Sequence, residues 1–308
     1  MGKAQSREIG TAKMHVDYSP AGIHHIIETA ESLAHGKNGI GSVELACVER
    51  MMDEYHIDGV YLDGTIIPRY CDNVEHGCGW YDKSGKLHGT YPVHAVRNTF
   101  KRLYDIVESR GGMIYVHLPN PNFTSLGFTH LAWYGEMMQM AYVRGGLSQM
   151  PLDHFRAAYA GRSMGVPAEF IAYENRPIWT FENALAMSVI HGILPRPNDI
   201  EWPLDLMAGV WKTIDSFPVE KAEWLPYWKN AAKASDERVL ISYYRYKAID
   251  GQVMCLVFCS NTCAETLSGV KIDIHESCTH ITDCTGDPVV SDGSFDFEPY
   301  TCRILYLC

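Results

Sequence analysis

Hydrophobic and polar positions alternate with two different periods along the chain. From residue 13 to about residue 218, short apolar runs that end in polar, Gly or Pro residues alternate with longer amphipathic stretches of helical period. Strands and helices that alternate in this way build parallel sheets joined by right-handed crossovers. The predicted strands are residues 14–18, 59–63, 113–118, 131–134 and 169–173, with a sixth at 191–195, and the predicted helices are residues 22–35, 43–55, 92–109, 152–164 and 180–191.

After about residue 235 the period changes to two, and runs rich in Val, Ile, Tyr and Phe are separated by turn residues. The Asp-Gly step at Asp250 and Gly251 is typical of a tight hairpin turn. This pattern predicts six or seven short strands in a small antiparallel β-sandwich. We therefore expect an N-terminal tail at 1–13, a barrel at 14–217, a connector at 218–236 whose aromatic residues pack the two domains together, and the sandwich at 237–308.

The first region predicts an α/β fold, a (β/α) TIM-type barrel, but it holds too few strands. A complete eight-stranded barrel takes about 250 residues, whereas this region shows five or six strands. The prediction is a barrel that is incomplete at its N-terminal strands. Either the barrel is degenerate, or the chain is the C-terminal portion of a longer protein. In both cases an oligomer or a missing N-terminal barrel segment would cover the open edge.

Composition and charge exclude several classes of partner. Among 308 residues, 26 are Lys or Arg and 37 are Asp or Glu, which gives a net charge of −11 that repels nucleic acid and anionic membranes. No apolar run reaches the length of about 20 residues that a membrane span needs. Residues 1–13 lack a secretory signal, so the chain as written is cytoplasmic, and it is periplasmic or secreted if a leader is missing upstream. Most of the ten cysteines are interpreted as reduced, and Cys255 and Cys259 as small buried hydrophobes.

Acidic residues follow three of the predicted strands. Asp63, Glu136 and Glu174 each come directly after an apolar run, and His117 closes another. Catalytic groups of parallel α/β folds collect at the C-terminal ends of strands. Glycoside hydrolysis requires two carboxyl groups, one that donates a proton to the leaving oxygen and one that attacks the anomeric carbon or activates water. The alternative is structural, with Asp63 capping a turn and His117 bonded to a carbonyl.

Aromatic residues accompany these acids, and an aromatic ring offers a flat apolar surface to the C–H face of a sugar. About half of such rings are expected to fill the core instead. The residues assigned to substrate binding are Glu174, His117, Tyr61, Trp80, Trp133, Tyr173 and Arg69.

The loop after Asp63 offers a weaker alternative. Cys71, His76 and Cys78 are residue types that suit zinc, but no second pair at zinc spacing is visible. We prefer a substrate-covering loop, and no cofactor is predicted. The motifs of serine hydrolases, P-loop proteins, zincins and Rossmann folds are absent from the sequence.

The run from Val16 to Pro20, followed by Ile57 to Gly64, resembles the third and fourth strands of α-galactosidase-like glycoside hydrolase barrels. With CDNVEHGCGW (71–80), Arg97 and the pair Gly135-Glu136, the chain resembles uncharacterised bacterial proteins near glycoside hydrolase family 123 over residues 14–215. The resemblance implies a barrel glycosidase in which the acid that ends the fourth strand is central. Family 123 uses neighbouring Asp and Glu residues in a substrate-assisted mechanism. The adjacent pairs here, Asp53-Glu54 and Asp236-Glu237, do not end predicted strands, so that mechanism is not carried over.

These observations favour a glycoside hydrolase acting on a bacterial, plant or host glycan, with Asp63 as nucleophile or transition-state stabiliser and Glu136 as general acid/base, and with retention of configuration favoured. Two other hypotheses stay open. One is a catalytically inactive carbohydrate-binding or scaffolding fragment of a larger barrel protein. The other is a metal-dependent hydrolase that uses Cys71, His76 and Cys78.

Overall fold

The computed structural model describes residues 5–9, 12–19, 22–27, 40–63, 70–75, 77–117, 123–135, 150–159, 165–172, 180–197, 203–276, 281–284 and 293–308. The chain divides into two compact units, Met1–Tyr134 with Ser163–Ala168, and Gly135–Arg162 with Glu169–Cys308. Each unit is described by itself below. The expected limits of the barrel and the sandwich, at residues 217 and 237, stay predictions.

The first unit begins with three strands: β1 (Gln5–Ile9), β2 (Ala12–Ser19) and β3 (Gly22–Ile27). β2 pairs antiparallel with both β1 and β3. Only two residues separate each strand from the next in the sequence, which allows a hairpin and is far too short for a parallel crossover. The tail expected at 1–13 therefore contains β1 and the start of β2.

The helix predicted at 22–35 is wrong over its first part, because residues 22–27 form β3. Three of these six residues are Ile, whose branched side chain favours strands over helices. The backbone of β3 also has partners on both sides, since it pairs antiparallel with β2 and parallel with β4 at Ile26 and Tyr61. Residues 28–35 lie outside the described residues.

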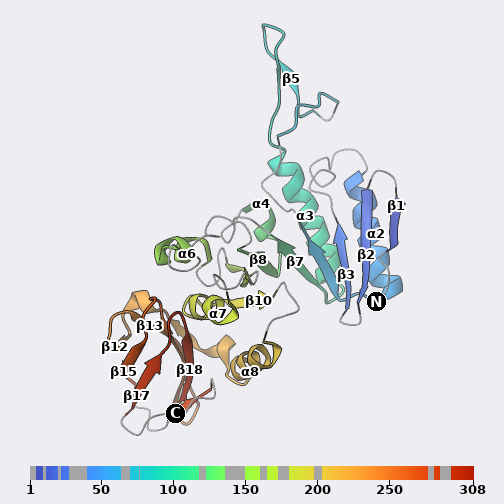
Figure 1. The fold of residues 1–308 in the computed structure, drawn as a ribbon. Helices are drawn as coiled ribbons and strands as arrows, with labels where there is room; N and C mark the ends of the chain where they lie inside the picture. Colours follow the sequence, from blue (N-terminus) through green and yellow to red (C-terminus); the bar gives the residue numbers. More distant parts are fainter. Residues whose placement is uncertain are drawn as a thin grey trace. The chain divides into compact units, whose positions relative to one another are not determined.

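Parallel pairing continues across the next strands, as the alternating pattern predicts. β4 (Gly59–Leu62) is parallel to β7 (Met113–His117), which is parallel to β8 (Leu131–Tyr134). The connections carry α2 (Ile40–Tyr55), α3 (Val93–Glu108) and the single turn α4 (Phe123–Leu126). Figure 1 shows α3 beside β7. The helix predicted at 92–109 is α3 to within one residue at each end. Pro92 is its N-cap residue, and Gly111, at φ +70°, follows its end.

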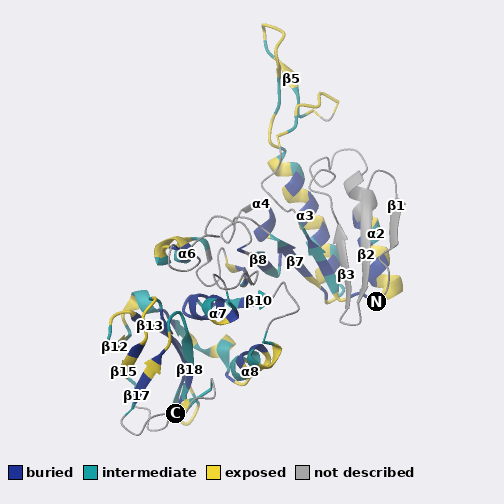
Figure 2. Cartoon of the chain, viewed as in Figure 1, coloured by how far each residue is buried: buried dark blue, intermediate teal, exposed yellow. Residues whose placement is uncertain are grey.

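The buried residues of the first unit mark the helix-covered face of its sheet (Figure 2). On the strands these are Val60, Leu62, Ile114, Val116 and Ala132, and on α3 they include Val96, Phe100, Leu103 and Val107. Since successive side chains of a strand point to opposite faces, the odd-numbered residues of β4, β7 and β8 point away from this core. That second face carries the candidate site.

Between β4 and α3 the chain forms an arm, defined here as residues 70–91. It contains the short strands β5 (Trp80–Tyr81) and β6 (Leu87–His88), which pair antiparallel. Figure 1 shows the arm extending from the N-terminal end of α3, away from β7 and β8.

The second unit contains most of β9 (Ala168–Ala172), which is parallel to β10 (Leu194–Pro197). The predicted sixth strand at 191–195 therefore exists, shifted towards the C-terminus. The helices are α6 (Leu152–Tyr159), α7 (Phe181–Val189) and α8 (Leu204–Asp215). Thr180 caps α7, since its side-chain oxygen accepts from the N–H of Asn183 at 3.2 Å.

The C-terminal part of this unit is antiparallel, as the period of two predicts. One sheet has the order β11-β13-β14-β18-β16 and the other β12-β15-β17. Their strands are β11 (Glu223–Leu225), β12 (Ala232–Ala234), β13 (Val239–Lys247), β14 (Val253–Asn261), β15 (Leu267–Ile274), β16 (Ile281–Asp283), β17 (Ser294–Phe297) and β18 (Cys302–Leu307). The two sheets contribute side chains to one hydrophobic cluster. Cys255 and Cys259 lie in it, which confirms their interpretation as small buried hydrophobes.

The hairpin predicted at Asp250 and Gly251 joins β13 to β14. The N–H of Gly251, at φ +90°, donates to Ala248 at 3.0 Å. The segment before β13 also holds the short 3-10 helices η3 (Val219–Lys221) and η4 (Tyr227–Lys229).

Within the second unit, α7 is joined to the C-terminal sheet by buried polar groups. The hydroxyl of Ser242, on β13, accepts from the N–H of Tyr227 at 2.9 Å and donates to the carbonyl of Ile190 at 2.7 Å. His191 Nδ1 donates to the carbonyl of Met187 at 2.7 Å, and the Tyr227 hydroxyl lies 3.3 Å from His191 Nε2. Burial lowers the pKa of His191 to about 4, so this imidazole is neutral at pH 7.

The longest described helices, α2 and α3, have 16 residues each. None of the helices in the described ranges could span a bilayer.

Candidate functional site

The site is built on the open face of three parallel strands. Tyr61 on β4 is paired in register with Tyr115 on β7, and His117, two residues further on, is paired with Trp133 on β8. Asp63 follows the last residue of β4. Because side chains alternate along a strand, all five residues lie on the face opposite the helix-covered core. The sequence therefore brings them together through strand register.

Asp63 and His117 are in direct contact at this edge. Nδ1 of His117 lies 2.8 Å from Oδ1 of Asp63. The side chain of His117 is 14% exposed and that of Asp63 is 44% exposed. An ionised carboxylate only accepts hydrogen bonds, so the contact requires the proton on Nδ1. The imidazole therefore fixes the orientation of the carboxylate, which stays accessible to solvent and to a ligand.

Aromatic rings surround this pair. Trp133 lies against His117, with ring centroids 5.5 Å apart, and against Tyr61 at 5.8 Å. Tyr115 lies on the same face, and its ring centroid is 5.4 Å from that of Tyr61 and 6.0 Å from that of Trp133. Tyr115 was not among the predicted site residues, although the period of two in residues 113–117 places it on the same face as His117. The result is an aromatic surface beside a carboxylate, which suits a polyhydroxylated ligand with apolar C–H faces.

The other predicted residues fall into two groups. Glu136, Glu174, Tyr173 and Arg69 lie outside the described residues, so their roles stay predictions. Trp80 belongs to β5 on the arm, and Figure 1 shows β5 well away from β7 and β8. Of the predicted set, the structure thus brings Asp63, His117, Tyr61 and Trp133 together.

The residues of the alternative metal site, Cys71, His76 and Cys78, belong to the arm. Cys71 forms a backbone bridge with Thr90, and the carbonyl of Cys78 accepts from the hydroxyl of Thr90 at 3.2 Å. His76 lies outside the described residues. Over the ranges that the structure describes, no three His, Cys, Asp or Glu side chains gather in a way that would hold a metal ion. The zinc hypothesis gains no support from the described residues.

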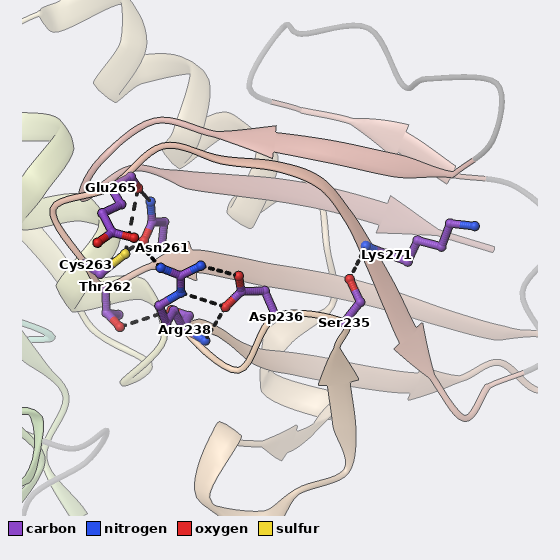
Figure 3. A network of polar contacts seen from close by, with 8 residues as sticks. All are labelled: Ser235, Asp236, Arg238, Asn261, Thr262, Cys263, Glu265 and Lys271. Atoms are coloured by element: carbon purple, nitrogen blue, oxygen red, sulfur yellow. Dashed lines mark hydrogen bonds and ion pairs between the residues drawn. The ribbon is translucent and has the colours of Figure 1, made fainter.

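In each of the two adjacent Asp-Glu pairs, the Asp accepts hydrogen bonds from an arginine side chain. Asp53, on α2, accepts hydrogen bonds from Arg110 at 2.7 and 3.0 Å. Asp236 accepts from the guanidinium of Arg238, which also pairs with Glu265, and Figure 3 shows this network between the turns of the C-terminal sheets. Hydrogen bonds from Arg238 lower the pKa of Asp236 to about 2. Neither Asp ends a parallel strand, in agreement with leaving the family 123 mechanism aside.

Comparison with known proteins gives a likeness in fold. No family model matches the chain, and no curated protein matches it in sequence. Among solved structures, a maltogenic α-amylase from Thermotoga neapolitana aligns with a TM-score of 0.51 at 12% identity, over 88% of this chain and 65% of that one. A β-L-arabinopyranosidase from Geobacillus stearothermophilus aligns with a TM-score of 0.43 at 10% identity, over 89% of this chain and 62% of that one. The chain thus spans about two thirds of the length of these proteins. The α-amylase likeness is one of fold, and it agrees with an α/β fold that has a parallel central sheet.

Proposed function

We propose that the chain is a glycoside hydrolase with a two-carboxylate mechanism. The observation that carries the proposal is the Asp63–His117 pair at the C-terminal ends of adjacent parallel strands, beside the rings of Tyr61 and Trp133. Barrel enzymes carry their catalytic groups at this end of the strands. The fold shared with an α-amylase supports the same class of chemistry. In this proposal the parallel strands belong to a TIM-type barrel, and the two C-terminal antiparallel sheets form a β-sandwich.

The proposed reaction proceeds with retention of configuration. Asp63 attacks the anomeric carbon while Glu136 gives a proton to the leaving oxygen, so that the glycosidic bond breaks and a glycosyl ester forms on Asp63. Glu136 then takes a proton from a water molecule, which attacks the anomeric carbon and releases Asp63 as a carboxylate. This mechanism requires the two carboxyl groups to lie about 5 to 5.5 Å apart. His117 keeps the attacking oxygen aligned, and Tyr61, Trp133, Tyr173, Glu174 and Arg69 bind the sugar.

A panel of 4-nitrophenyl glycosides tests the proposal. The wild-type chain should release nitrophenol from at least one of them, and Asp63→Asn should lower the rate by about 10³-fold or more. Asp58→Asn is the matched control, because Asp58 is an exposed carboxylate at the opposite end of β4, and it should keep wild-type activity.

Equal rates in Asp63→Asn and wild type would remove Asp63 from the mechanism. Binding of sugars by wild type with no hydrolysis on any member of the panel would instead favour the inactive carbohydrate-binding or scaffolding chain.

A further inference from the structure

The arm is held in one conformation by hydrogen bonds within itself. At its base, Cys71 and Thr90 exchange two backbone hydrogen bonds of 2.9 Å, and the Tyr70 hydroxyl accepts from the N–H of Gly89 at 2.6 Å. Gly79 and Gly89 permit close packing there, since a Cβ on Gly79 would lie 1.9 Å from the carbonyl oxygen of Asp72.

The tip of the arm is organised by one carboxylate. Oδ1 of Asp82 accepts from the N–H groups of Ser84 at 2.8 Å and Lys86 at 3.0 Å. Oδ2 of the same residue lies 2.8 Å from Nε2 of His88. The Ser84 hydroxyl also donates to Oδ1 at 2.6 Å, and this hydrogen bond, together with those from His88 and the backbone, lowers the pKa of Asp82 to about 2, so the carboxylate remains ionised at neutral pH. An isolated two-stranded hairpin is marginally stable in water, and Asp82 supplies the additional contacts that hold this one.

Apolar side chains on this ordered arm face solvent. Trp80 is 52% exposed, Tyr81 61% and Leu87 38%. The ring of Trp80 stacks on His88, with centroids 4.8 Å apart and an interplanar angle of 21°. Since His88 is fixed by Asp82, one face of the indole is supported and its orientation is set. A rigid aromatic ring loses little conformational entropy when it binds a ligand.

The arrangement of the rings favours a small flat ligand unit over a broad protein surface. Trp80 is paired with His88, and Tyr81 with Leu87. Neighbouring residues of a strand point to opposite faces, so Trp80 and Tyr81 lie on opposite faces of the hairpin and do not extend one another into a broad apolar patch. Of the other exposed rings on the arm, Tyr70 and Tyr91 contact each other, with centroids 5.7 Å apart. The face with Trp80 offers a single exposed indole ring for stacking.

Charge argues against a nucleic acid as the ligand. Single-stranded nucleic acids also stack on aromatic rings, but they require a positively charged groove beside them. Asp72, Glu75 and Asp82 outnumber Lys83 and Lys86 on the arm, and the whole chain has a net charge of −11. A neutral sugar has no phosphate for these carboxylates to repel.

We infer that the Trp80–His88 face of the arm binds a pyranose unit of a neutral polysaccharide, at a site separate from Asp63. This goes beyond the proposed function, because binding at the arm requires no hydrolysis. It also assigns Trp80 to a second carbohydrate site in place of the candidate active site.

Affinity electrophoresis of the full chain through gels that contain starch, xylan, β-glucan or arabinogalactan tests the inference. At least one polysaccharide should retard the wild-type chain, and Trp80→Ala should weaken the binding by about tenfold or more. Trp80→Phe, which keeps a ring on His88, should retain most of the binding. Tyr55→Ala is the matched control, because Tyr55 is an exposed aromatic residue on α2, and it should bind as wild type does.

Asp63→Asn separates this inference from the proposed function, since it should lose hydrolysis and keep its retardation. Equal retardation of Trp80→Ala and wild type, or no retardation of wild type by any of the four polysaccharides, would overturn the inference. It would also be overturned if light scattering showed a dimer that Trp80→Ala converts to a monomer without any polysaccharide binding, because the ring would then serve a protein contact.

Discussion

Nδ1 of His117 lies 2.8 Å from Oδ1 of Asp63, although the two residues are 54 positions apart in the sequence. The contact depends on the pairing of β4 with β7, which begins at Gly59 and Met113 and carries Leu62 alongside Val116. Asp63 follows Leu62, and His117 follows Val116, so the two residues lie next to each other. Strand register therefore determines the geometry of the candidate site.

His117→Ala should lower kcat for a glycoside substrate by about 100-fold and change KM little, because it removes the group that orients the Asp63 carboxylate. Steady-state kinetics measures this effect, and circular dichroism checks that the fold is kept. His94→Ala is the control, since His94 is an exposed histidine on α3. If kcat is the same in His117→Ala and wild type, His117 does not position the carboxylate.

His191 should make the stability of the chain depend on pH. Its pKa is lowered by burial from 6.5 to about 4, so the unfolded chain binds the proton more readily than the folded chain. The stabilising contribution is complete above pH 6.5 and is lost as the pH falls towards 4, with a loss of about 2 kcal/mol between pH 7 and pH 5. Urea unfolding at the two pH values measures it. His191→Gln has no such titration, so its stability should fall less over this range; an equal fall would rule out the imidazole as the cause.

Two serines on neighbouring strands should respond differently to loss of the hydroxyl. Ser242→Ala removes a partner from both the Tyr227 N–H and the Ile190 carbonyl, and should lower the free energy of unfolding by about 1 to 3 kcal/mol. Ser260 is also buried, but among the described residues its hydroxyl has no hydrogen-bond partner. Ser260→Ala should therefore change stability by less than about 0.5 kcal/mol. Chemical denaturation distinguishes them, and equal losses would contradict the bridging role of Ser242.

Two glycines form a second matched pair. A Cβ on Gly59 would lie 2.1 Å from the carbonyl oxygen of Met113, so Gly59→Ala should force β4 and β7 apart and cost about 1 to 3 kcal/mol. Gly209 lies inside α8 with open space around it, and Gly209→Ala should stabilise the chain by about 0.5 to 1 kcal/mol. Thermal unfolding should shift in opposite directions, and a neutral Gly59→Ala would show that the two strands approach less closely.

The sequence predicts elements well where local signals agree with the final pairing. Residues 113–117 include the β-branched Ile114 and Val116, follow two glycines, and form β7. Residues 22–27 carry helix-compatible spacing but form β3, because strand pairing outweighs a weak local preference. β1 was missed because its sequence, QSREI, has no apolar alternation, and its pairing with β2 defines it.

The candidate site is predictable in part for the same reason. The apolar runs place Asp63 and His117 at strand ends and Trp133 within a strand, and the structure puts His117 beside both of the others. The contact between Asp63 and His117 was not predicted, since register is a property of two strands and a single strand does not contain it. Trp80 lies in no predicted strand. The sequence between Asp63 and Trp80 does not indicate the direction in which the arm extends.

The two faces of the sheet formed by β4, β7 and β8 carry side chains with different surroundings. Even-numbered side chains such as Leu62 and Val116 are buried beneath the helices, while odd-numbered ones such as Tyr61 and His117 lie on the same face as the Asp63 carboxylate. Substitutions at the odd positions consequently change the surface around Asp63 and leave the buried side chains beneath the helices unchanged. Variants limited to Tyr61, Tyr115 and Trp133 can thus test whether this face binds a sugar while the buried layer of the sheet is kept.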